Sequence, residues 1–288
     1  MRWAVAEFVE IVEMSPRDGL QNETRPISVA DKIRLVDLLS GVGFRRIEVA
    51  SFVSPKWVPQ MEGSEKVLAG IRRAPGVRYA ALTPNLKGYE GARAARADEV
   101  AVFASASEGF SRANLNCTIA ESIDRFRPVA EAARADGIPL RGYVSMVTDC
   151  PFDGPIAPAS VARVVAALGD LGCHEVSLGD TVGRGTPETI DRMLSAVLGE
   201  LPPARLAGHY HDTWGRALDN IEVSLARGLR VFDASAGGLG GCPYAPGAKG
   251  NVATERVAAR LADRGFETGL DRARLEEAAA FAVALRAG

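Results

Sequence analysis

Short extended hydrophobic runs alternate along the chain with longer stretches of helical spacing. Runs of the first kind are typical of strands buried on both faces, and stretches of the second kind are typical of amphipathic helices. No hairpin turn is evident between successive runs, so the pattern predicts parallel strands joined by helices. Eight strands are predicted, over residues 8–14, 45–53, 78–83, 99–107, 140–147, 175–180, 205–212 and 231–238.

Helix signals lie between several of these strands. Thr118 with Glu121 has the spacing of a capping box. Thr186 with Pro187 places an N-cap before a proline at the first helical position. Residues 161–172 have helical apolar spacing and end at a glycine. Eight strand–helix repeats, with no G-x-G-x-x-G after any strand, favour a closed (β/α)8 TIM barrel over an open doubly wound sheet.

The barrel is expected to occupy the whole chain. No proline- or serine-rich linker and no shift in composition divides the 288 residues. TIM barrels of about this length form a single domain. We therefore predict one domain over residues 1–288, in which residues 271–288 form an added C-terminal helix packed on the barrel.

Composition and charge exclude several classes of protein. The chain is 47% hydrophobic and 24% charged, with a formal net charge of −2, so neither disorder nor a basic nucleic-acid-binding face is indicated. No run of 18 uninterrupted apolar residues could span a membrane, and Glu7 and Glu10 interrupt the N-terminus where a signal peptide would be apolar. The four cysteines form no C-x-x-C pair. We expect a cytoplasmic protein with reduced thiols.

Two of the three histidines stand two residues apart in the seventh predicted strand. Side chains alternate along a strand, so His209 and His211 should share a face and converge at the C-terminal mouth of the barrel. Asp18 after the first strand and the amide oxygen of Asn251 after the eighth would add two oxygen ligands. Mixed imidazole and oxygen ligands suit an octahedral Mg²⁺ or Mn²⁺, and tetrahedral zinc is the alternative.

A carboxylate stands alone in the second predicted strand. Glu48 lies inside the apolar run IEVASF, where an unpaired charge is costly, so it should have a cationic partner. Arg17, at the end of the neighbouring strand, is the nearest candidate. The pair is either a structural ion pair or a device that orients the guanidinium toward a substrate, and the two roles are compatible.

A glycine-rich segment follows the eighth predicted strand. Residues 237–241 hold four glycines, which is typical of a loop with wide backbone freedom. Its place after a barrel strand suits a mobile active-site loop. Cys242, at the end of this loop, is either an inert small hydrophobe or a residue with a chemical role.

Several segments, in order and over nearly the whole chain, resemble the 3-hydroxy-3-methylglutaryl-CoA lyases, within the wider group of metal-dependent TIM-barrel lyases and Claisen-type synthases. The most specific of them lie around Asp18 and Cys242. The segments are PRDGLQNE (16–23), SFVSPKWVPQM (51–61), LTPNLKG (82–88), NCTIAES (116–122), SLGDTVGRGTP (177–187), GHYHDTWGRALDNI (208–221) and GGLGGCPYAPGAKGNVATE (237–255).

The resemblance implies a retro-Claisen cleavage of 3-hydroxy-3-methylglutaryl-CoA to acetyl-CoA and acetoacetate. It implies an acyl-CoA substrate, no nucleic-acid or membrane partner, and a homodimer. The implied Mg²⁺ or Mn²⁺ ligands are Asp18, His209, His211 and Asn251. The implied catalytic residues are Arg17, Glu48 and Cys242. The expected substrate-binding residues are Arg17, Asp180 and Thr181, with Lys56 and Lys87 as candidates for the CoA phosphates because they follow the second and third strands.

Several alternatives remain at this point. The general base is Asp18 or His209. The substrate could be another 3-hydroxyacyl-CoA, such as citramalyl-CoA, and Gly109 near the fourth strand stands where the resembling family commonly has a larger residue. A condensing synthase or aldolase of the same barrel group is disfavoured because only 18 residues follow Leu270. A catalytically silent metal-binding barrel is disfavoured by the complete set of ligands together with Arg17.

Overall fold

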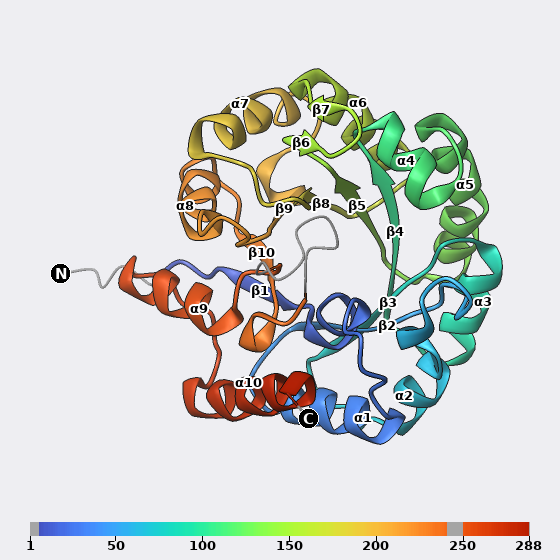
Figure 1. Cartoon of the computed structure of the whole chain (residues 1–288), viewed down its shortest axis with the longest axis vertical. Helices are drawn as coiled ribbons and strands as arrows, with labels where there is room; N and C mark the ends of the chain where they lie inside the picture. The colour runs from blue at the N-terminus through green and yellow to red at the C-terminus, as the bar shows by residue number, and fades with distance from the viewer. Residues whose placement is uncertain (1–5, 241–249, 288) are drawn as a thin grey trace.

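Eight parallel strands close into a barrel in the computed structural model, which describes residues 6–240 and 250–287 (Figure 1). Around the barrel the strand order is β1-β10-β9-β8-β5-β4-β3-β2. The predicted TIM barrel is confirmed, and each predicted strand is present with ends that differ from the prediction by at most four residues. The strands are β1 (Glu10–Glu13), β2 (Arg46–Ser51), β3 (Arg78–Leu82), β4 (Glu99–Ser105), β5 (Leu140–Ser145), β8 (Glu175–Asp180), β9 (Leu206–Tyr210) and β10 (Val231–Ala234).

Helices form the outer ring of the barrel (Figure 1). The predicted caps are present, because Thr118 accepts a hydrogen bond from the N–H of Glu121, and Thr186 makes the same contact with Thr189. The helix expected over 161–172 is present as α6, which begins at Pro158 and ends at Asp170. The helices are α1 (Val29–Ser40), α2 (Ser64–Gly70), α3 (Leu86–Ala94), α4 (Glu108–Leu115), α5 (Ile119–Asp136), α6 (Pro158–Asp170), α7 (Pro187–Val197), α8 (Ala217–Ala226), α9 (Thr254–Asp263) and α10 (Arg272–Ala287).

Two apolar layers follow from the alternation of side chains along the strands. In β4, Val100 and Val102 belong to the large layer between strands and helices, whereas Ala101 belongs to a smaller layer inside the barrel. Met14 and Tyr143 also lie in this inner layer. The inner layer lies inside the barrel beneath its C-terminal mouth and supports the residues there.

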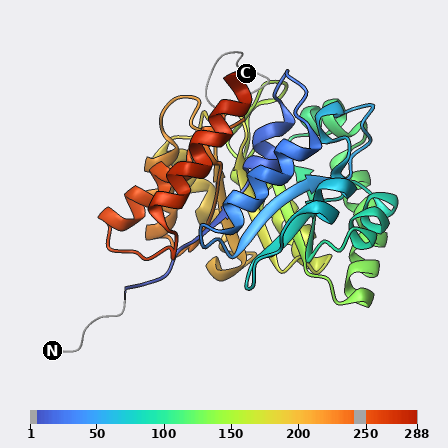
Figure 2. The ribbon, with the colours of Figure 1, turned by 90° about the horizontal axis from the view of Figure 1, so that it is seen from below.

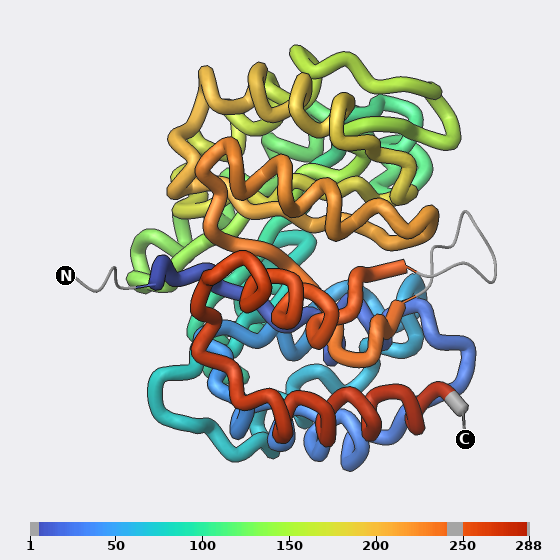
Figure 3. Tube along the Cα trace, turned by 90° about the vertical axis from the view of Figure 1, so that its left-hand side faces the viewer, coloured from blue at the N-terminus to red at the C-terminus, as the bar shows by residue number. Residues whose placement is uncertain are grey.

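The added C-terminal helix is present and packs beside α1, as Figure 2 shows. Figure 3 shows α8, α9 and α10 following one another along one side of the molecule. Leu275, Ala278 and Ala282 are the buried side chains of α10. The same helix contacts residues 236–238, which follow β10, so it also supports the loop at the mouth.

Two local features differ from the expectation. Ser15–Gly19 form a short π-helix directly after β1. A small antiparallel hairpin of β6 (Asp149–Cys150) and β7 (Gly154–Pro155), which was not predicted, lies between β5 and α6, whereas the barrel strands pair in parallel as predicted. The N–H of Gly109 donates to Asp153 in the turn of this hairpin (2.8 Å), so the hairpin is anchored on α4.

The barrel interior, toward the N-terminal ends of the strands, holds a buried ion network that was not predicted. Arg46 donates to both carboxylate oxygens of Glu175 (2.8 and 3.1 Å) and to Glu10 (2.7 Å). Arg141 donates to Glu175 (2.8 Å) and to Asp233 (2.8 and 3.2 Å). Each buried charge therefore has an opposite charge beside it, which offsets the cost of burial. No helix of the described segments is both long and apolar enough to cross a membrane.

Candidate active site and metal centre

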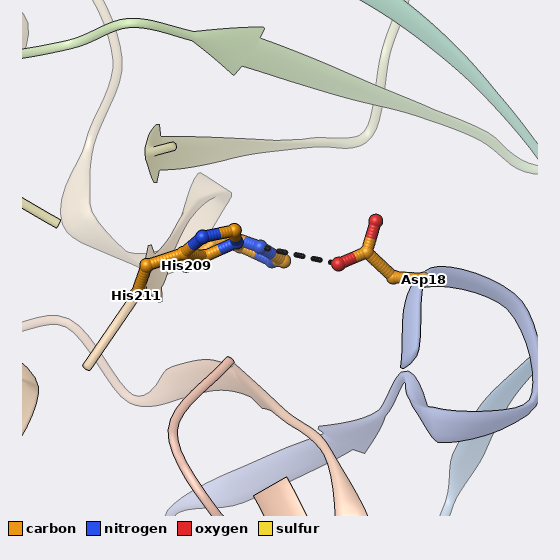
Figure 4. Close-up of side chains that lie close together, drawn as sticks. All are labelled: Asp18, His209 and His211. Carbon is orange, nitrogen blue, oxygen red and sulfur yellow. Dashed lines mark ion pairs between the residues drawn. The ribbon is translucent and has the colours of Figure 1, made fainter. Parts of the chain in front are cut away.

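The two histidines of the seventh barrel strand meet an aspartate at the mouth of the barrel. His209 lies in β9 and His211 follows its end, and their ring centroids are 5.3 Å apart. The carboxylate of Asp18, carried by the π-helix after β1, faces both rings, with 3.8 Å between its Oδ2 and Nε2 of His209 (Figure 4). One ligand atom from each of the three residues lies within 4.8 Å of the others.

The protonation states of Asp18 and His211 suit a cation. Burial opposes ionisation of Asp18, but the positive charge of Arg17 and the two imidazoles outweigh it, so the pKa of Asp18 lies well below its usual value. Burial, followed by the neighbouring His209, lowers the pKa of His211 to about 4. At neutral pH the site therefore presents a carboxylate and a neutral imidazole, both of which are good ligands.

An orphaned atom gives a further reason why the site fits a metal ion. Nδ1 of His211 is buried and has no hydrogen-bond partner in the part of the chain that the structure describes. A buried polar atom without a partner is costly, and a bound cation or its water would satisfy it. The donor set of Asp18, His209 and His211 thus fits the predicted divalent ion.

Asn251 lies against the same cluster. Its side-chain Nδ2 donates to Oδ2 of Asp18 (2.8 Å) and to the carbonyl of Leu239 (3.2 Å). Its backbone pairs with that of His211 in an isolated antiparallel bridge. Gly240 makes this approach available, because a Cβ there would lie 2.7 Å from Nδ2 of Asn251 and because its φ is +110°.

The predicted ion pair between Arg17 and Glu48 is present. Arg17 is 6% exposed and Glu48 is 1% exposed. The Nε of Arg17 donates to Oε1 of Glu48, and its Nη1 donates to Asp18. The hydroxyl of Tyr143 donates to Oε2 of Glu48, and the guanidinium lies 5.7 Å from the centroid of the Tyr143 ring. These contacts fix the guanidinium beside the candidate metal ligands.

Asp180 is the last residue of β8 and Thr181 follows it, at the same end of the barrel. Asp180 is buried, and its carboxylate accepts from the hydroxyl of Thr148 (2.7 Å) and from the N–H of Gly185 (2.8 Å). Burial raises the pKa of Asp180. Thr181 accepts from the N–H of Met146 (3.3 Å). Both side chains therefore support the loop that follows β8.

Two further predicted residues, Lys56 and Lys87, are not among the residues of this cluster. Lys56 and Lys87 are exposed, the first in the segment after β2 and the second in the first turn of α3. Cys242 falls in residues 241–249, outside the described part of the chain.

Two buried carboxylates near the site were missed by the sequence reasoning. Asp233 in β10 lies 3.2 Å from Nδ1 of His209. Glu13 in β1 accepts from the N–H of Ser15 (2.8 Å) and the N–H of Ala236 (3.0 Å), so it joins the π-helix to the segment after β10. Asp233 is a lone acid in an apolar run, which is the same signal that drew attention to Glu48, whereas Glu13 shares its run with Glu10.

The fold and this cluster define a TIM-barrel protein with a candidate divalent-metal centre at the C-terminal ends of its strands. The model of the HMGL-like family matches residues 8–282. The chain therefore belongs to the HMGL-like family, and the resemblance noted in the sequence is confirmed.

Individual relatives agree with this assignment. A Pseudomonas aeruginosa protein named 3-hydroxy-3-isohexenylglutaryl-CoA/hydroxymethylglutaryl-CoA lyase is 58% identical over 270 residues, or 94% of this chain and 90% of that protein. The structure of the HMG-CoA lyase from Brucella melitensis matches with a TM-score of 0.97 and 66% identity, over 98% of this chain and 100% of that one. An Acinetobacter baumannii HMG-CoA lyase in complex with coenzyme A and 3-methylmalate has a TM-score of 0.93 and 38% identity, over 99% and 93% of the two chains.

Proposed function

We propose that this chain is a hydroxymethylglutaryl-CoA lyase, which cleaves 3-hydroxy-3-methylglutaryl-CoA to acetyl-CoA and acetoacetate. Similarity to proteins of that name supports the assignment over most of the chain. The observation that carries it is the position of Arg17. Its fixed guanidinium contacts Asp18, so a cation for a developing enolate lies beside ligands for a divalent ion.

The reaction needs a base, a cation for the enolate and an acid. The base takes the proton of the tertiary hydroxyl, the carbon–carbon bond breaks as the ketone of acetoacetate forms, and its electron pair moves to the thioester oxygen. The base is Asp18, which contacts Arg17, or His209, whose Nε2 lies 3.8 Å from Asp18. The Arg17 guanidinium, held by Glu48, offers a preorganised positive charge to the enolate oxygen, which is the kind of contribution that dominates many enzymatic rates.

The last step is protonation of the enolate carbon, which completes acetyl-CoA. We assign this proton transfer to Cys242, the thiol at the end of the glycine-rich segment that follows β10. Closure of that segment over the substrate would exclude water from the reactive enolate.

We propose that Asp18, His209, His211 and Asn251 hold Mg²⁺ or Mn²⁺. When bound, the ion supplies Lewis-acid polarisation of the substrate oxygens, which makes removal of the hydroxyl proton feasible at neutral pH. The buried, unpartnered Nδ1 of His211 and the contact of the Asn251 amide with Asp18 support this ligand set.

The CoA part of the substrate is assigned to the rim of the barrel. Lys56 and Lys87 are exposed cations in segments that follow neighbouring strands, and we propose that they contact the CoA phosphates. Asp180 and Thr181 are proposed to contact the acyl group through the loop that they support. The similar structure of the Acinetobacter baumannii HMG-CoA lyase is a complex with coenzyme A, and this supports an acyl-CoA substrate.

Three further expectations describe the protein as a whole. We propose one domain over residues 1–288, a homodimer and a cytoplasmic location. The three cysteines described, Cys117, Cys150 and Cys173, are free thiols, which fits a reducing compartment. Light scattering coupled to size-exclusion chromatography measures the mass of the assembly directly.

The test is a product analysis with a panel of thioesters. The purified chain with Mg²⁺ would be given 3-hydroxy-3-methylglutaryl-CoA, citramalyl-CoA and 3-hydroxy-3-isohexenylglutaryl-CoA, the last because a relative carries that name. We expect acetyl-CoA and acetoacetate in equal amounts from the first. Cleavage of citramalyl-CoA alone, or of none of the three, would contradict the proposal. Asp18→Asn serves as the inactive control for contaminating lyase.

A further inference from the structure

A buried carboxylate stands directly behind the candidate metal centre. Asp233 projects from β10 into the barrel, and its side chain is fully buried. Its Oδ2 lies 3.2 Å from Nδ1 of His209, on the side of the imidazole opposite to the atom that approaches Asp18. Within the described residues, the hydrogen bonds and ion pairs of Asp233 are with His209, Arg141 and Ser177, so His209 is the residue that connects it to the centre.

The other partners of Asp233 establish which atom carries the shared proton. Arg141 donates to both carboxylate oxygens, and the hydroxyl of Ser177 donates to Oδ2 (2.7 Å). An arginine remains protonated, so it holds Asp233 in its ionised form. A carboxylate has no proton to give, so Nδ1 of His209 must be the donor.

This hydrogen bond determines the tautomer of His209. A neutral imidazole carries one proton, so a ring that is protonated at Nδ1 has a free lone pair at Nε2. Nε2 is the atom that faces Asp18, at 3.8 Å from its Oδ2. In the opposite tautomer, the lone pair of Nδ1 would face the charged Asp233, and the Nε2 proton would occupy the position of the ion.

The imidazoles of His209 and His211 differ in the groups that orient them. Its Nδ1 has no hydrogen-bond partner in residues 6–240 and 250–287, so no described side chain selects its tautomer through that atom. His209 is oriented instead by a carboxylate that strands β5 and β8 hold in place through Arg141 and Ser177. Hydrogen-bonded carboxylates of this kind raise the basicity of a ligating imidazole and fix its orientation.

We propose that Asp233 is a positioning residue that holds His209 in the Nδ1-protonated tautomer and thereby presents Nε2 to the divalent ion. This inference rests on the metal centre of the proposed function. Arg141 connects Asp233 to Glu175, so the interior ion network supports the orientation of a ligand at the mouth.

The test variant is Asp233→Asn, which keeps the shape and removes the charge. Its amide carries two protons, so one of the two positions now occupied by oxygens becomes a donor. We expect the affinity for Mn²⁺, measured by calorimetry or by the free-ion EPR signal, to fall about 10- to 100-fold. Glu99→Gln is the matched control. It neutralises another buried carboxylate of the barrel, one that pairs with Arg46 and His174 and not with His209, so its affinity should stay near that of the wild type.

A spectroscopic readout tests the tautomer itself. The chain has only three histidines, so long-range ¹H–¹⁵N spectra of the labelled full-length protein with Mg²⁺ can resolve each ring, and His211→Ala and His174→Gln assign them. We expect Nδ1–H for His209 in the wild type and a shift toward Nε2–H in Asp233→Asn. Protonation at Nε2 in the wild type would overturn the proposal, even if Asp233→Asn failed to fold.

The proposal would also be overturned if Asp233→Asn bound Mn²⁺ with an affinity within about twofold of the wild type. Loss of a carboxylate that orients a ligating histidine is expected to cost far more than that. Neither readout requires thioester cleavage. A chain that meets both expectations but leaves 3-hydroxy-3-methylglutaryl-CoA intact would therefore contradict the proposed function alone.

Discussion

Arg17 illustrates how single residues at the mouth are held by charge. Its guanidinium is buried, which by itself is costly, but Glu48 and Asp18 supply two opposite charges that offset the cost. Burial acts to lower the pKa of Arg17, yet those charges raise it above its usual value, so the side chain stays charged. The charge is therefore present and oriented before substrate arrives.

Arg17→Lys tests whether this geometry matters. Lysine keeps the charge but lacks the planar fork that contacts Glu48 and Asp18 together. We expect kcat to fall on the order of 10²–10³-fold, the size associated with loss of one preorganised donor, while Mn²⁺ still binds. Steady-state kinetics and calorimetry measure the two effects. The control is Arg127→Lys on the exposed face of α5. Wild-type turnover in Arg17→Lys would leave Arg17 only a structural role.

The sequence indicated Glu48 but not Asp233, and the reason is the distance along the chain to the cationic partner of each. Glu48 and Asp233 are both lone acids in apolar strands, but Glu48 has its partner directly after the neighbouring strand β1, where a sequence argument can find it. The cationic partner of Asp233 is Arg141, which is 92 residues away and joined to it only by closure of the barrel. Contacts of that kind follow from the three-dimensional fold and have no local signature.

Among the elements of the fold, the strands and the helix caps could be predicted from the sequence. The short segments that connect strands to helices, such as the π-helix after β1, could not be predicted as well. The apolar runs of the strands and the pattern at Thr118 act locally, so they can be read from the chain. The π-helix after β1 depends on Glu13, which accepts from Ser15 and from Ala236, a residue more than two hundred positions away. Its position could not be predicted from residues 15–19 alone.

The loop after β10 gives a prediction about thiol reactivity. Cys117, Cys150 and Cys173 are buried, and burial raises the pKa of Cys173 to about 12, so these thiols should react slowly. We expect alkylation to modify Cys242 first and to inactivate the enzyme, and a substrate analogue with Mg²⁺ to slow both. Cys242→Ser should lower kcat by about 10²-fold or more.

Mass spectrometry of partially alkylated protein identifies the first cysteine modified. Cys117→Ser is the control for loss of a thiol outside the proposed chemistry. If a different cysteine accounts for inactivation while Cys242→Ser turns over normally, the thiol of Cys242 takes no part in proton transfer.

The molecule as a whole is held together by apolar layers and by the ion network inside the barrel. Burial acts to raise the pKa of Glu175, but Arg141 and Arg46 outweigh it, and the pKa is lowered in the folded state. A carboxylate whose pKa is lower in the folded than in the unfolded chain stabilises the fold above its unfolded value of about 4.3. That stabilisation disappears as pH falls through the folded pKa.

Chemical denaturation at several pH values tests this network. We expect the free energy of unfolding to decline as pH falls below about 4.5 and to change little between about pH 6 and 8 from these groups. Glu175→Gln should cost about 3–5 kcal/mol at neutral pH, because it leaves Arg46 and Arg141 without a shared partner. The cost should shrink in acid. A Glu175→Gln variant as stable as the wild type at neutral pH would show that the network contributes little.

The central claim is that cleavage depends on a divalent ion held by Asp18, His209 and His211. The most direct measurement is acetoacetate release by the chelated chain as Mn²⁺ is added back. We expect release to be negligible without metal and to rise until about one ion is bound per chain. His211→Ala should require far more Mn²⁺ and remain slow, whereas His174→Gln, outside the cluster, should titrate like the wild type. Full release from the chelated chain, or an unchanged titration in His211→Ala, would contradict the account.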